Sequence, residues 1–527
     1  MNALIRIAEH LVAGAKAAPR RLAFADASRR IDRARLSADV AHVATLLVDA
    51  GIAPGDRVAT YAPKSYEAVV GMLAVNLAGA MLVPIHPQLK EGQIRHILAD
   101  SAARLVLTTQ ARMRRFTSLQ SRRDLIYWLT EHLLPPVPLL GVEPPRPVPV
   151  VDSDPAAILY TSGSSGPPKG VVLSQRNLVA GAQSVAAYQR LEPDDVILGL
   201  LPLSFDAGLS QLTSALVAGA CYAPLDFLTA DEVPDHCARV RATSITGVPP
   251  LWMQLADADW PPAVAGQIRR IASTGGHMPR ALLERLRTTF VRAEPYLMYG
   301  LTEAFRSTWL SPQDASERPD SIGKAVPNAE VLVLRPDGSV CADDEPGELV
   351  HRGAFVTLGY WNAPELTAQR YRPAPRRHGE IPLGDTAVWS GDIVRRDGDG
   401  FLYFIARSDD LIKTSGYRVS PTEIEDVLFT DAAVVEAAVI GVPHPQLGQA
   451  IVACVRVRGD SAQKARDLAR LCHEALPTYM VPRHIAVGVE ALPRGPTGKI
   501  DRAHLKNSHA LHFEPAPPQG PGPVRPC

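Results

Sequence analysis

The sequence predicts an α/β fold in which mostly parallel sheets are covered by helices, and three observations lead to this prediction. The chain has 527 residues, which is too long for one ordinary core and enough for several subdomains. Apolar strand-like runs alternate with helix-like segments between residues 36 and 310, as in parallel sheets joined by helices. A proline-rich connection at 134–149 separates a first α/β unit from the next segment. Strands are expected at 57–61, 104–108, 196–200 and 269–273.

Composition and charge argue against several classes of protein. The 55 Lys and Arg residues balance the 55 Asp and Glu residues, so no broad attraction to nucleic acid or to an anionic membrane is expected. The six cysteines show no C-x-x-C spacing, which argues against a zinc site or a disulfide framework and is typical of the cytoplasm. The N-terminal apolar run contains charges, so it does not resemble a signal peptide.

Residues 68–85 are apolar except for Asn76 and are the stretch that could be mistaken for a membrane span. The stretch is barely long enough, it contains two glycines and a proline, and its flanks show no Lys/Arg bias. We therefore predict a buried helix to about Ala78, followed by a buried strand at 80–85, and no membrane insertion.

Residues 157–173 combine the features of a phosphate-binding loop. An apolar run ends at Tyr160, gives way to hydroxyl residues and glycines, and resumes as a second apolar run after a lysine. Glycines let the backbone approach an anion closely, and consecutive N–H groups form a nest for phosphate oxygens. The hydroxyl groups and the lysine add donors and a positive charge. The candidate residues are Thr161, Ser162, Gly163, Ser164, Ser165, Gly166 and Lys169.

Two other interpretations of this loop are weaker. A flexible Gly/Ser linker is disfavoured because apolar strands flank the loop closely on both sides. A P-loop of the Walker type needs G-x-x-x-x-G-K-[ST] at the start of a helix, whereas residues 170–173 have the pattern of a strand. The loop is therefore predicted to join two strands.

The segment 296–304 reads as a strand that runs into a turn at Gly300. In one interpretation, Tyr299 stacks on a purine and Glu303 holds a hard cation such as magnesium, which bridges phosphates. In the other, Thr302 caps a helix and Glu303 lies favourably in its first turn. The segment alone leaves both interpretations open.

Three later segments also allow a functional and a structural interpretation. Asp392, after a glycine turn, could accept both hydroxyls of a ribose or could be an ordinary turn aspartate. The charged strip 404–418 could be a domain junction that absorbs large backbone changes or a surface hairpin. Lys499, on a loop rich in glycine and proline, is an exposed cation unless the last domain brings it to the phosphate site.

Taken together and in this order, the five motifs resemble those of the adenylate-forming superfamily. This superfamily comprises acyl-CoA synthetases, adenylation domains of nonribosomal peptide synthetases, and luciferases. Residues 201–211 and 299–308 look most like exosortase-associated AMP-forming acyl-CoA ligases and stand-alone amino-acid ligases that load carrier proteins. The resemblance covers about residues 36–505 and rests on 160–170, 299–303, 390–392, 407–413 and 493–499.

The resemblance implies two domains and a two-step reaction. A large N-terminal domain of stacked mixed and parallel sheets with helices is expected at 1–408, and a small mobile α+β domain with the catalytic lysine at 409–507. The tail at 508–527 is rich in proline, cannot bury a core and is expected to be disordered. A carboxylate would attack the α-phosphate of ATP, giving an acyl-adenylate and pyrophosphate. A phosphopantetheine thiol of CoA or of a carrier protein would then displace AMP. The sequence contains no carrier domain, so a separate thiol acceptor is expected.

The resemblance also implies roles for single residues. Lys499 would bridge the carboxylate and the α-phosphate, Mg²⁺ near Glu303 and Thr161 would neutralise the phosphates, and Lys169 would hold the pyrophosphate. Asp409 would be the hinge, although this motif begins with alanine where glycine is usual. Other nucleotide-binding residues would be Gly275, Gly276, Tyr299 and Phe404 at the adenine, Gly300 and Thr302 in the adjoining turn, and Asp392 and Arg407 at the ribose.

The sequence defines the acid-binding pocket less clearly. Asp206 falls where amino-acid-activating domains hold the substrate ammonium, and a buried carboxylate needs a cationic partner, so an amino acid is favoured over a plain fatty acid. Asp206 could also be a structural carboxylate near a helix start. Arg306 could pair with Asp206, which would remove the ammonium argument, or could hold an acidic group of the substrate. Further pocket residues by the same resemblance are Phe205, Ala207, Ser210, Gly247, Thr274 and Met298.

Two other functions fit the sequence less well. A hydrolytic or phosphoryl-transfer NTPase would need a GK[ST] loop that opens a helix. A degenerate nucleotide-binding protein without catalysis is disfavoured because Lys169, Glu303, Asp392 and Lys499 are all intact.

Overall fold

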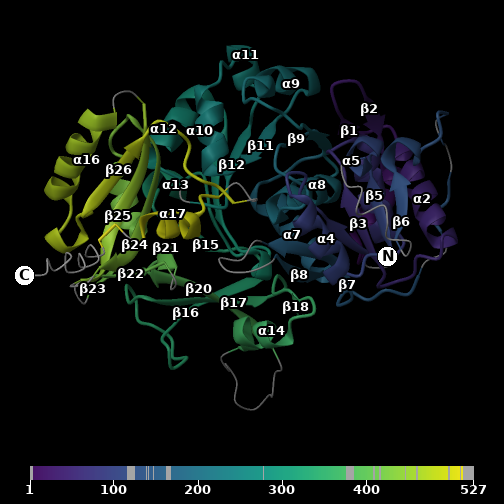
Figure 1. Ribbon diagram of the computed structural model, residues 1–527. Coiled ribbons are helices and arrows are strands. Elements are labelled where there is room, and N and C mark those ends of the chain that lie inside the picture. Colours follow the sequence, from purple (N-terminus) through teal and green to yellow (C-terminus); the bar gives the residue numbers. More distant parts are fainter. Residues whose placement is uncertain are drawn as a thin grey trace, which may run out of the picture. The chain divides into compact units, whose positions relative to one another are not determined.

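The structure is a computed structural model of the chain (Figure 1) and divides into two compact units. The first unit comprises Met1–Ser390 and Val394–Phe404, and the second comprises Gly391–Ile393 and Ile405–Cys527. Each unit has hydrophobic cores of its own. The residues that the structure describes are 4–114, 125–137, 139, 142–145, 148–161, 168–276, 278–374, 385–407, 410–414, 417–444, 447–458, 461–495, 499–510 and 512–513.

A nine-stranded sheet of the first unit brings the carboxyl ends of six parallel strands to one edge. In such sheets, ligands bind outside this edge, where the loops to the helices begin. The parallel strands, in sheet order, are β13 (Glu294–Tyr299), β12 (Arg270–Ser273), β11 (Ser244–Gly247), β9 (Val196–Gly199), β10 (Cys221–Pro224) and β1 (Leu22–Ala25). β14 (Thr308–Leu310), β15 (Lys324–Ala325) and β2 (Arg30–Asp32) are antiparallel to their neighbours at the two ends.

A seven-stranded sheet of the same unit is parallel except at one end. At that end, β8 pairs in antiparallel fashion with both β7 and β18. The order is β18 (Gly359–Tyr360), β8 (Lys169–Ser174), β7 (Pro155–Thr161), β4 (Met81–Pro84), β3 (Arg57–Tyr61), β5 (Leu105–Thr108) and β6 (Ile126–Leu129).

Five helices share one core with a face of each sheet. Side chains alternate along each strand, so Val58 of β3 and Ile197 of β9 face this shared core while their neighbours Ala59 and Leu198 face the opposite sides. The helices are α1 (Ile7–Ala17), α2 (Arg33–Asp49), α3 (Tyr66–Leu77), α7 (Gln175–Tyr188) and α8 (Asp206–Ala218). The outer faces are covered by α4 (Glu91–Asp100) on one sheet and by α9 (Glu232–Val240), α10 (Pro249–Asp257) and α12 (Arg280–Thr289) on the other.

Single residues mark one end each of helices α7 and α8. The Ser174 hydroxyl accepts a hydrogen bond from the Asn177 N–H and caps α7. Gly219 ends α8 in the left-handed conformation, with φ of 69°.

A smaller sheet consists of β16 (Ala329–Leu334), β17 (Gly347–Gly353), β20 (Thr386–Arg396), β19 (Tyr371–Pro373) and β21 (Leu402–Arg407).

The second unit contains an α+β arrangement in which helices cover both faces of one sheet. Successive residues of β24 alternate between two cores: Ala437 and Val439 pack with α15 and α16, and Ala438 and Ile440 pack with α17. The elements are β22 (Ile412–Thr414), β23 (Tyr417–Val419), α15 (Pro421–Leu428), β24 (Val434–His444), β25 (Gly448–Val457), α16 (Ser461–Ala475), β26 (His484–Gly488) and α17 (Arg502–His509).

The predicted α/β class is confirmed, and so are the strands predicted from the alternating pattern. β3 matches its predicted bounds, and β5, β9 and β12 differ by one residue at one end. Residues 68–85 form a buried helix and a buried strand as predicted, α3 and β4. Within the described parts of the chain, no helix is long and apolar enough to cross a membrane. Helix α17 extends to His509 and Phe513 packs on the α17 core, so the described fold continues past Asn507, where the tail was expected to begin.

Candidate active site

The candidate phosphate loop connects two antiparallel strands. Thr161, the last residue of β7, lies opposite Lys169, the first residue of β8. The Thr161 hydroxyl lies 3.5 Å from the Lys169 carbonyl oxygen. This strand–loop–strand arrangement is the predicted one and differs from a Walker loop, which opens a helix. The loop residues Ser162, Gly163, Ser164, Ser165 and Gly166 lie outside the described residues.

The Glu303 carboxylate is held by a neutral donor. The Tyr360 hydroxyl donates a hydrogen bond of 2.5 Å to Glu303 Oε1. The Thr357 N–H and hydroxyl both donate to the Glu303 carbonyl oxygen, at 3.0 and 2.9 Å. Burial, and then the negative charge of Glu303, raise the pKa of Tyr360, so the phenol stays a donor. The Glu303 carboxylate is therefore oriented by an uncharged donor.

Strand β18 places this carboxylate beside the phosphate hairpin. Tyr360 pairs with Val171 of β8, and the Trp361 N–H donates to the Gly170 carbonyl oxygen at 2.7 Å. The donor that orients Glu303 is thus attached to the strand that starts at Lys169. The interpretation of Thr302 as a helix cap does not hold, because Thr302–Ala304 is a single 3₁₀ turn and its cap position is Leu301.

Three rings gather at the end of β13. Tyr299 lies 6.4 Å from Phe404 and 6.2 Å from His351, centroid to centroid, and its ring is nearly parallel to that of His351. Tyr299 and Phe404, both predicted to line the adenine, are therefore neighbours. His351 is buried, and burial lowers its pKa to about 3, so the imidazole is neutral.

Gly275 and Gly276 follow β12 at the same edge of the sheet. Gly275 has a φ of +79°, which disfavours any residue with a Cβ atom. An added Cβ would lie 3.3 Å from Val248 Cγ1 and 3.7 Å from the Phe205 ring. The Thr274 N–H donates to the Gly247 carbonyl oxygen at 3.2 Å. The backbone conformation of Gly275, more than lack of space, therefore favours glycine beside Phe205 of the predicted acid pocket.

Asp392 and Arg407, both predicted at the ribose, are close in the second unit. Arg407 Nη1 lies 3.7 Å from Asp392 Oδ1, and Asp392 is buried while Arg407 is exposed. The predicted hinge residue, Asp409, lies outside the described residues.

Asp206 and Arg306 form a buried ion pair. Arg306 Nη1 lies 3.9 Å from Asp206 Oδ2, and Nη2 donates to the Asp206 carbonyl oxygen at 3.3 Å. Asp206 Oδ1 accepts the Ala207 N–H at 2.7 Å. The carboxylate thus has a cationic partner within the protein, and the argument that it needs a substrate ammonium no longer applies.

Phe305 fixes the position of Arg306. It is buried with a φ of +35°, an uncommon conformation for a residue with a side chain. Its ring packs into a notch on helix α7 at Gly181, where an added Cβ would lie 2.5 Å from the ring. The Arg306 guanidinium lies over the same ring, 4.9 Å from its centroid, and donates to the Phe305 carbonyl oxygen at 2.8 Å.

Other predicted pocket residues lie on the elements that meet at this edge. Ser210 lies on α8 and is buried. Met298 faces helix α7, where its sulfur accepts hydrogen bonds from the Tyr188 hydroxyl and the Gln189 amide. Met298 therefore contributes to the wall between β13 and α7.

Lys499 is exposed in the second unit, and hydrogen bonds link the described residues on its two sides. The Gly495 N–H donates to the Lys499 carbonyl oxygen at 2.9 Å, and the Asp501 N–H donates to the Pro493 carbonyl oxygen at 2.8 Å. Arg494 Nη2 donates to Glu436 Oε1 of β24 at 2.5 Å. Hydrogen bonds thus join residues before and after Lys499, and Arg494 ties the segment before it to the sheet.

Sequence reasoning missed Tyr360 and Thr357, the two residues that hold Glu303. Neither belongs to a recognised motif, and their role depends on the pairing of β18 with β8. It also missed His351, which reads as an ordinary strand residue. In the sequence around Tyr360, a short glycine–aromatic pair at 359–360 was the only feature that could have drawn attention to this residue.

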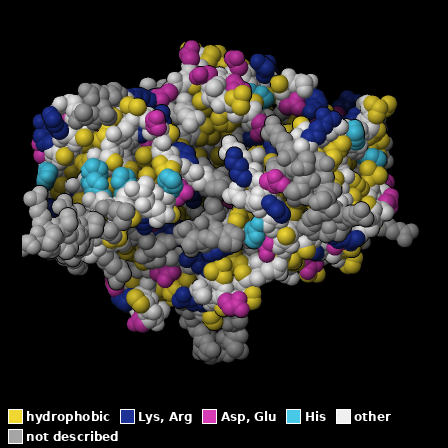
Figure 2. Space-filling view, in the orientation of Figure 1, with side chains coloured by type: hydrophobic (Ala, Val, Ile, Leu, Met, Phe, Trp, Pro, Cys, Tyr) yellow, Lys and Arg dark blue, Asp and Glu magenta, His cyan; other side chains and the backbone are white. Residues whose placement is uncertain are grey.

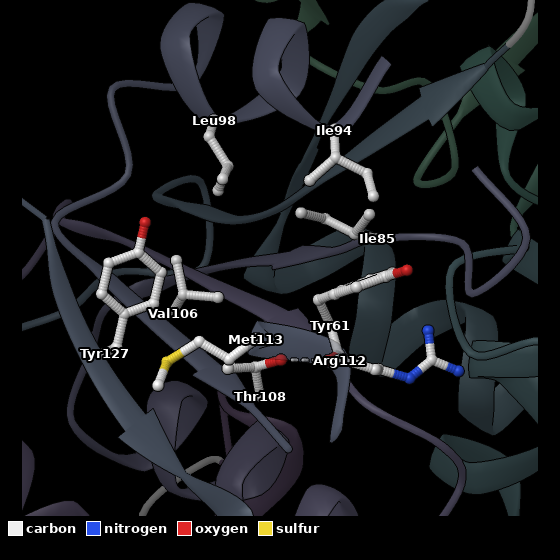
Figure 3. A pocket seen from close by; sticks show the side chains of 9 residues that line it. All are labelled: Tyr61, Ile85, Ile94, Leu98, Val106, Thr108, Arg112, Met113 and Tyr127. Atoms are coloured by element: carbon white, nitrogen blue, oxygen red, sulfur yellow. Dashed lines mark hydrogen bonds between the residues drawn. The ribbon is translucent and has the colours of Figure 1, made fainter. Parts of the chain in front are cut away.

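A small cavity lies away from these residues, between α4 and strands β3, β5 and β6 (Figure 3). Its lining is largely apolar, and the Thr108 hydroxyl there donates to the Tyr61 carbonyl oxygen at 2.8 Å. It contains none of the predicted site residues, so it is not the candidate active site.

Two family models match the chain. The model described as "AMP-binding enzyme" matches residues 11–361, and the model described as "AMP-binding enzyme C-terminal domain" matches residues 423–499. The first match covers more than half of the chain.

Relatives of known activity include ligases of two kinds. Sulfoacetate–CoA ligase of Cupriavidus necator is 31% identical over 496 residues, 92% of this chain and 93% of that protein. L-proline–[L-prolyl-carrier protein] ligase of Pseudomonas fluorescens is 30% identical over 510 residues, 92% and 96% of the two chains. A linear gramicidin synthase of Brevibacillus parabrevis is 30% identical over 495 residues, which are 93% of this chain but 9% of that protein.

Solved structures of similar proteins share the fold along nearly their whole length. ATP-bound MatB from Rhodopseudomonas palustris superposes with a TM-score of 0.84 at 26% identity, covering 96% of this chain and 100% of that one. The o-succinylbenzoate CoA synthetase of Bacillus subtilis with its acyl-adenylate intermediate superposes with a TM-score of 0.81 at 27% identity. The match covers 94% of this chain and 97% of that one.

Proposed function

The chain belongs to the AMP-binding enzyme family and is an adenylate-forming ligase, and we propose that it activates a small carboxylic acid for transfer to coenzyme A. The observation that carries the proposal is the Glu303 carboxylate, which is oriented by Tyr360 beside the phosphate hairpin. An acid and ATP are both anions, so their reaction requires positive charge where they meet.

Glu303 and Thr161 fit a magnesium ion bound to phosphate. Both offer oxygen atoms, which Mg²⁺ prefers, and one of them is a carboxylate oriented by an uncharged donor. When bound, the ion would neutralise the phosphates during attack by the acid. Lys169 is proposed to hold the pyrophosphate, and Gly300 and Thr302 to border the nucleotide. Tyr299 and Phe404, with the glycines at 275–276, are proposed to enclose the adenine.

Lys499 is proposed to bridge the acid and the α-phosphate. Its side chain is exposed, and the Lys499 carbonyl oxygen accepts a hydrogen bond from the Gly495 N–H in the same unit. Asp392 and Arg407 are proposed to hold the ribose, and Asp409 to be the hinge about which a domain beginning near residue 409 moves.

The acid is proposed to lack an α-ammonium group. The Asp206 carboxylate has its counter-charge in Arg306, so it does not call for one from the substrate. Arg306 Nε is buried and has no hydrogen-bond partner among the described residues, which supports an acid with a second acceptor group. Sulfoacetate and oxalate, the acids in the names of two relatives, have such a group.

A second candidate is an amino-acid ligase that loads a carrier protein. The L-proline ligase among the relatives supports it. Coenzyme A is preferred as the acceptor because the carrier-protein alternative is tied to an amino acid, and the pocket has no uncompensated carboxylate for its ammonium.

The five described cysteines are free and buried, which suits action in the cytoplasm.

The test is ATP–pyrophosphate exchange with a panel of dicarboxylic, sulfonated, fatty, aryl and amino acids. Exchange that depends on one acid class identifies the substrate, and mass spectrometry with CoA or a carrier protein identifies the acceptor.

Lys499→Ala should abolish exchange while ATP still binds. Lys464→Ala is the matched control, because this lysine of the same unit pairs with Asp431 at 2.9 Å. Full exchange in Lys499→Ala would refute the assigned role.

A further inference from the structure

Three histidines of the second unit meet where β26 begins and α17 ends. His484 is the first residue of β26, His509 is the last residue of α17, and His512 lies three residues further on. One metal-binding atom from each histidine lies within 4.8 Å of the other two. Figure 2 shows histidine side chains gathered on the surface of this unit, in the region of these elements.

We propose that His484, His509 and His512 bind one divalent transition-metal ion, with Zn²⁺ as the expected occupant. Imidazole nitrogens suit Zn²⁺, Cu²⁺ and Ni²⁺, whereas Mg²⁺ prefers oxygen ligands. The site is therefore chemically distinct from the oxygen ligands proposed around Glu303. Three protein nitrogens would leave one position of a tetrahedral ion for water.

The distances are close to those that a metal requires. With Zn–N bonds of about 2.0–2.1 Å, the nitrogens of a tetrahedral site lie about 3.3 Å apart. The histidine atoms, at up to 4.8 Å, need to close by about 1.5 Å or less. His512 is exposed, so rotation of its side chain can supply this movement. The rings of His484 and His512 already lie 4.2 Å apart, centroid to centroid.

The neighbouring residues fix the backbone of one histidine and contact the ring of another. His484 is anchored in the sheet, where it pairs with Val452 of β25. His509 Nε2 lies 3.5 Å from the sulfur of Cys454. When Nε2 carries the proton and donates to this sulfur, Nδ1 presents its lone pair to an ion. Such contacts from outside the ligand set orient metal-binding histidines.

The site would fasten the end of α17 to β26. Helix α17 starts at Arg502, directly after the loop that carries Lys499, and Leu505 anchors it in the core. A bound ion would therefore stabilise the element that closes this loop. Cysteine spacing argued against a zinc site, but it does not report on a site made of imidazoles from residues distant in the sequence.

The experiment is a Zn²⁺ titration of the full-length, tag-free protein by calorimetry, starting from protein treated with EDTA. Wild type should bind one equivalent. His484→Gln, His509→Gln and His512→Gln should each weaken binding at least tenfold. The control is His504→Ala, an exposed histidine on the same helix as His509, which should bind as wild type does.

Two further measurements separate metal binding from folding and from ligase function. Co²⁺ should give the visible absorption of a tetrahedral site in wild type and His504→Ala but not in His512→Gln, and circular dichroism in EDTA should be the same for all variants. Glu303→Gln should bind Zn²⁺ normally even if it is inactive. Failure of the wild type to bind one equivalent, or equal binding by all the histidine variants, would overturn the proposal.

Discussion

Glu303 and Asp206 are two carboxylates near the carboxyl edge of the same sheet, and they have opposite kinds of partner. Glu303 is hydrogen-bonded by the neutral phenol of Tyr360, while Asp206 lies 3.9 Å from the guanidinium of Arg306. A neutral donor orients a carboxylate and leaves its charge available to a cation. A guanidinium cancels that charge. The type of partner is therefore our reason for proposing Glu303, and not Asp206, as the carboxylate that serves a magnesium ion.

Removing one half of the ion pair tests this comparison most severely. Arg306→Met should lower the free energy of unfolding by about 3–5 kcal/mol, because it leaves a buried carboxylate without a counter-charge. Denaturant unfolding measures the loss. The double variant Asp206→Asn/Arg306→Met should recover most of it, because both charges are then gone. Equal stability of the single and double variants would show that the two groups are not coupled.

Removing the charge of Glu303 should affect activity rather than stability. Glu303→Gln keeps an oxygen that can accept from Tyr360 but loses the negative charge, so exchange activity should fall about 100-fold or more. The midpoint of thermal unfolding should change little. Activity within threefold of wild type would remove Glu303 from the proposed magnesium site.

A third ionisable group, His351, sharpens the comparison because neither ring nitrogen has a hydrogen-bond partner among the described residues. Burial lowers the pKa of His351 to about 3, below the unfolded value near 6.5. The buried neutral imidazole therefore contributes fully to the free energy of unfolding above about pH 6.5, and this contribution is lost as the pH falls. The loss should reach about 2 kcal/mol at pH 5. His351→Leu should flatten this part of the pH–stability curve. An unchanged slope would contradict the prediction.

The smallest expected effect concerns the neutral donor itself. Tyr360→Phe leaves the Glu303 charge in place but removes the bond that orients it, so exchange activity should fall about tenfold. Tyr403→Phe is the control, because this phenol hydrogen-bonds to Asp397. If Tyr360→Phe were as damaging as Glu303→Gln, the tyrosine would have a role beyond orientation.

Local patterns in the sequence were sufficient for much of the fold. Strand runs such as 196–199 are apolar and bounded by turn residues, so their positions follow from composition alone. The hairpin between β7 and β8 was predicted from the strand pattern on both sides of the glycine-rich loop. Motif order then identified Lys499, Glu303 and Asp392 as candidates, although their roles still await experiment.

Partners that depend on long-range geometry were beyond the sequence. The contact of Tyr360 with Glu303 requires β18 to pair with β8, and no spacing rule connects residues 171 and 360. The sequence raised the pairing of Asp206 with Arg306 as one alternative, but only the distance between them selects it. The histidine cluster likewise joins a strand and a helix end that are distant along the chain.

If Arg306 binds the acid as proposed, the notch at Gly181 gives helix α7 an indirect influence on the choice of acid. Phe305 keeps its unusual backbone conformation because its ring fits there, and Arg306 is the next residue. Any bulkier residue at 181 would displace that ring and redirect the guanidinium. Efforts to redesign what the enzyme accepts could therefore begin on α7, at a position that need never touch the substrate.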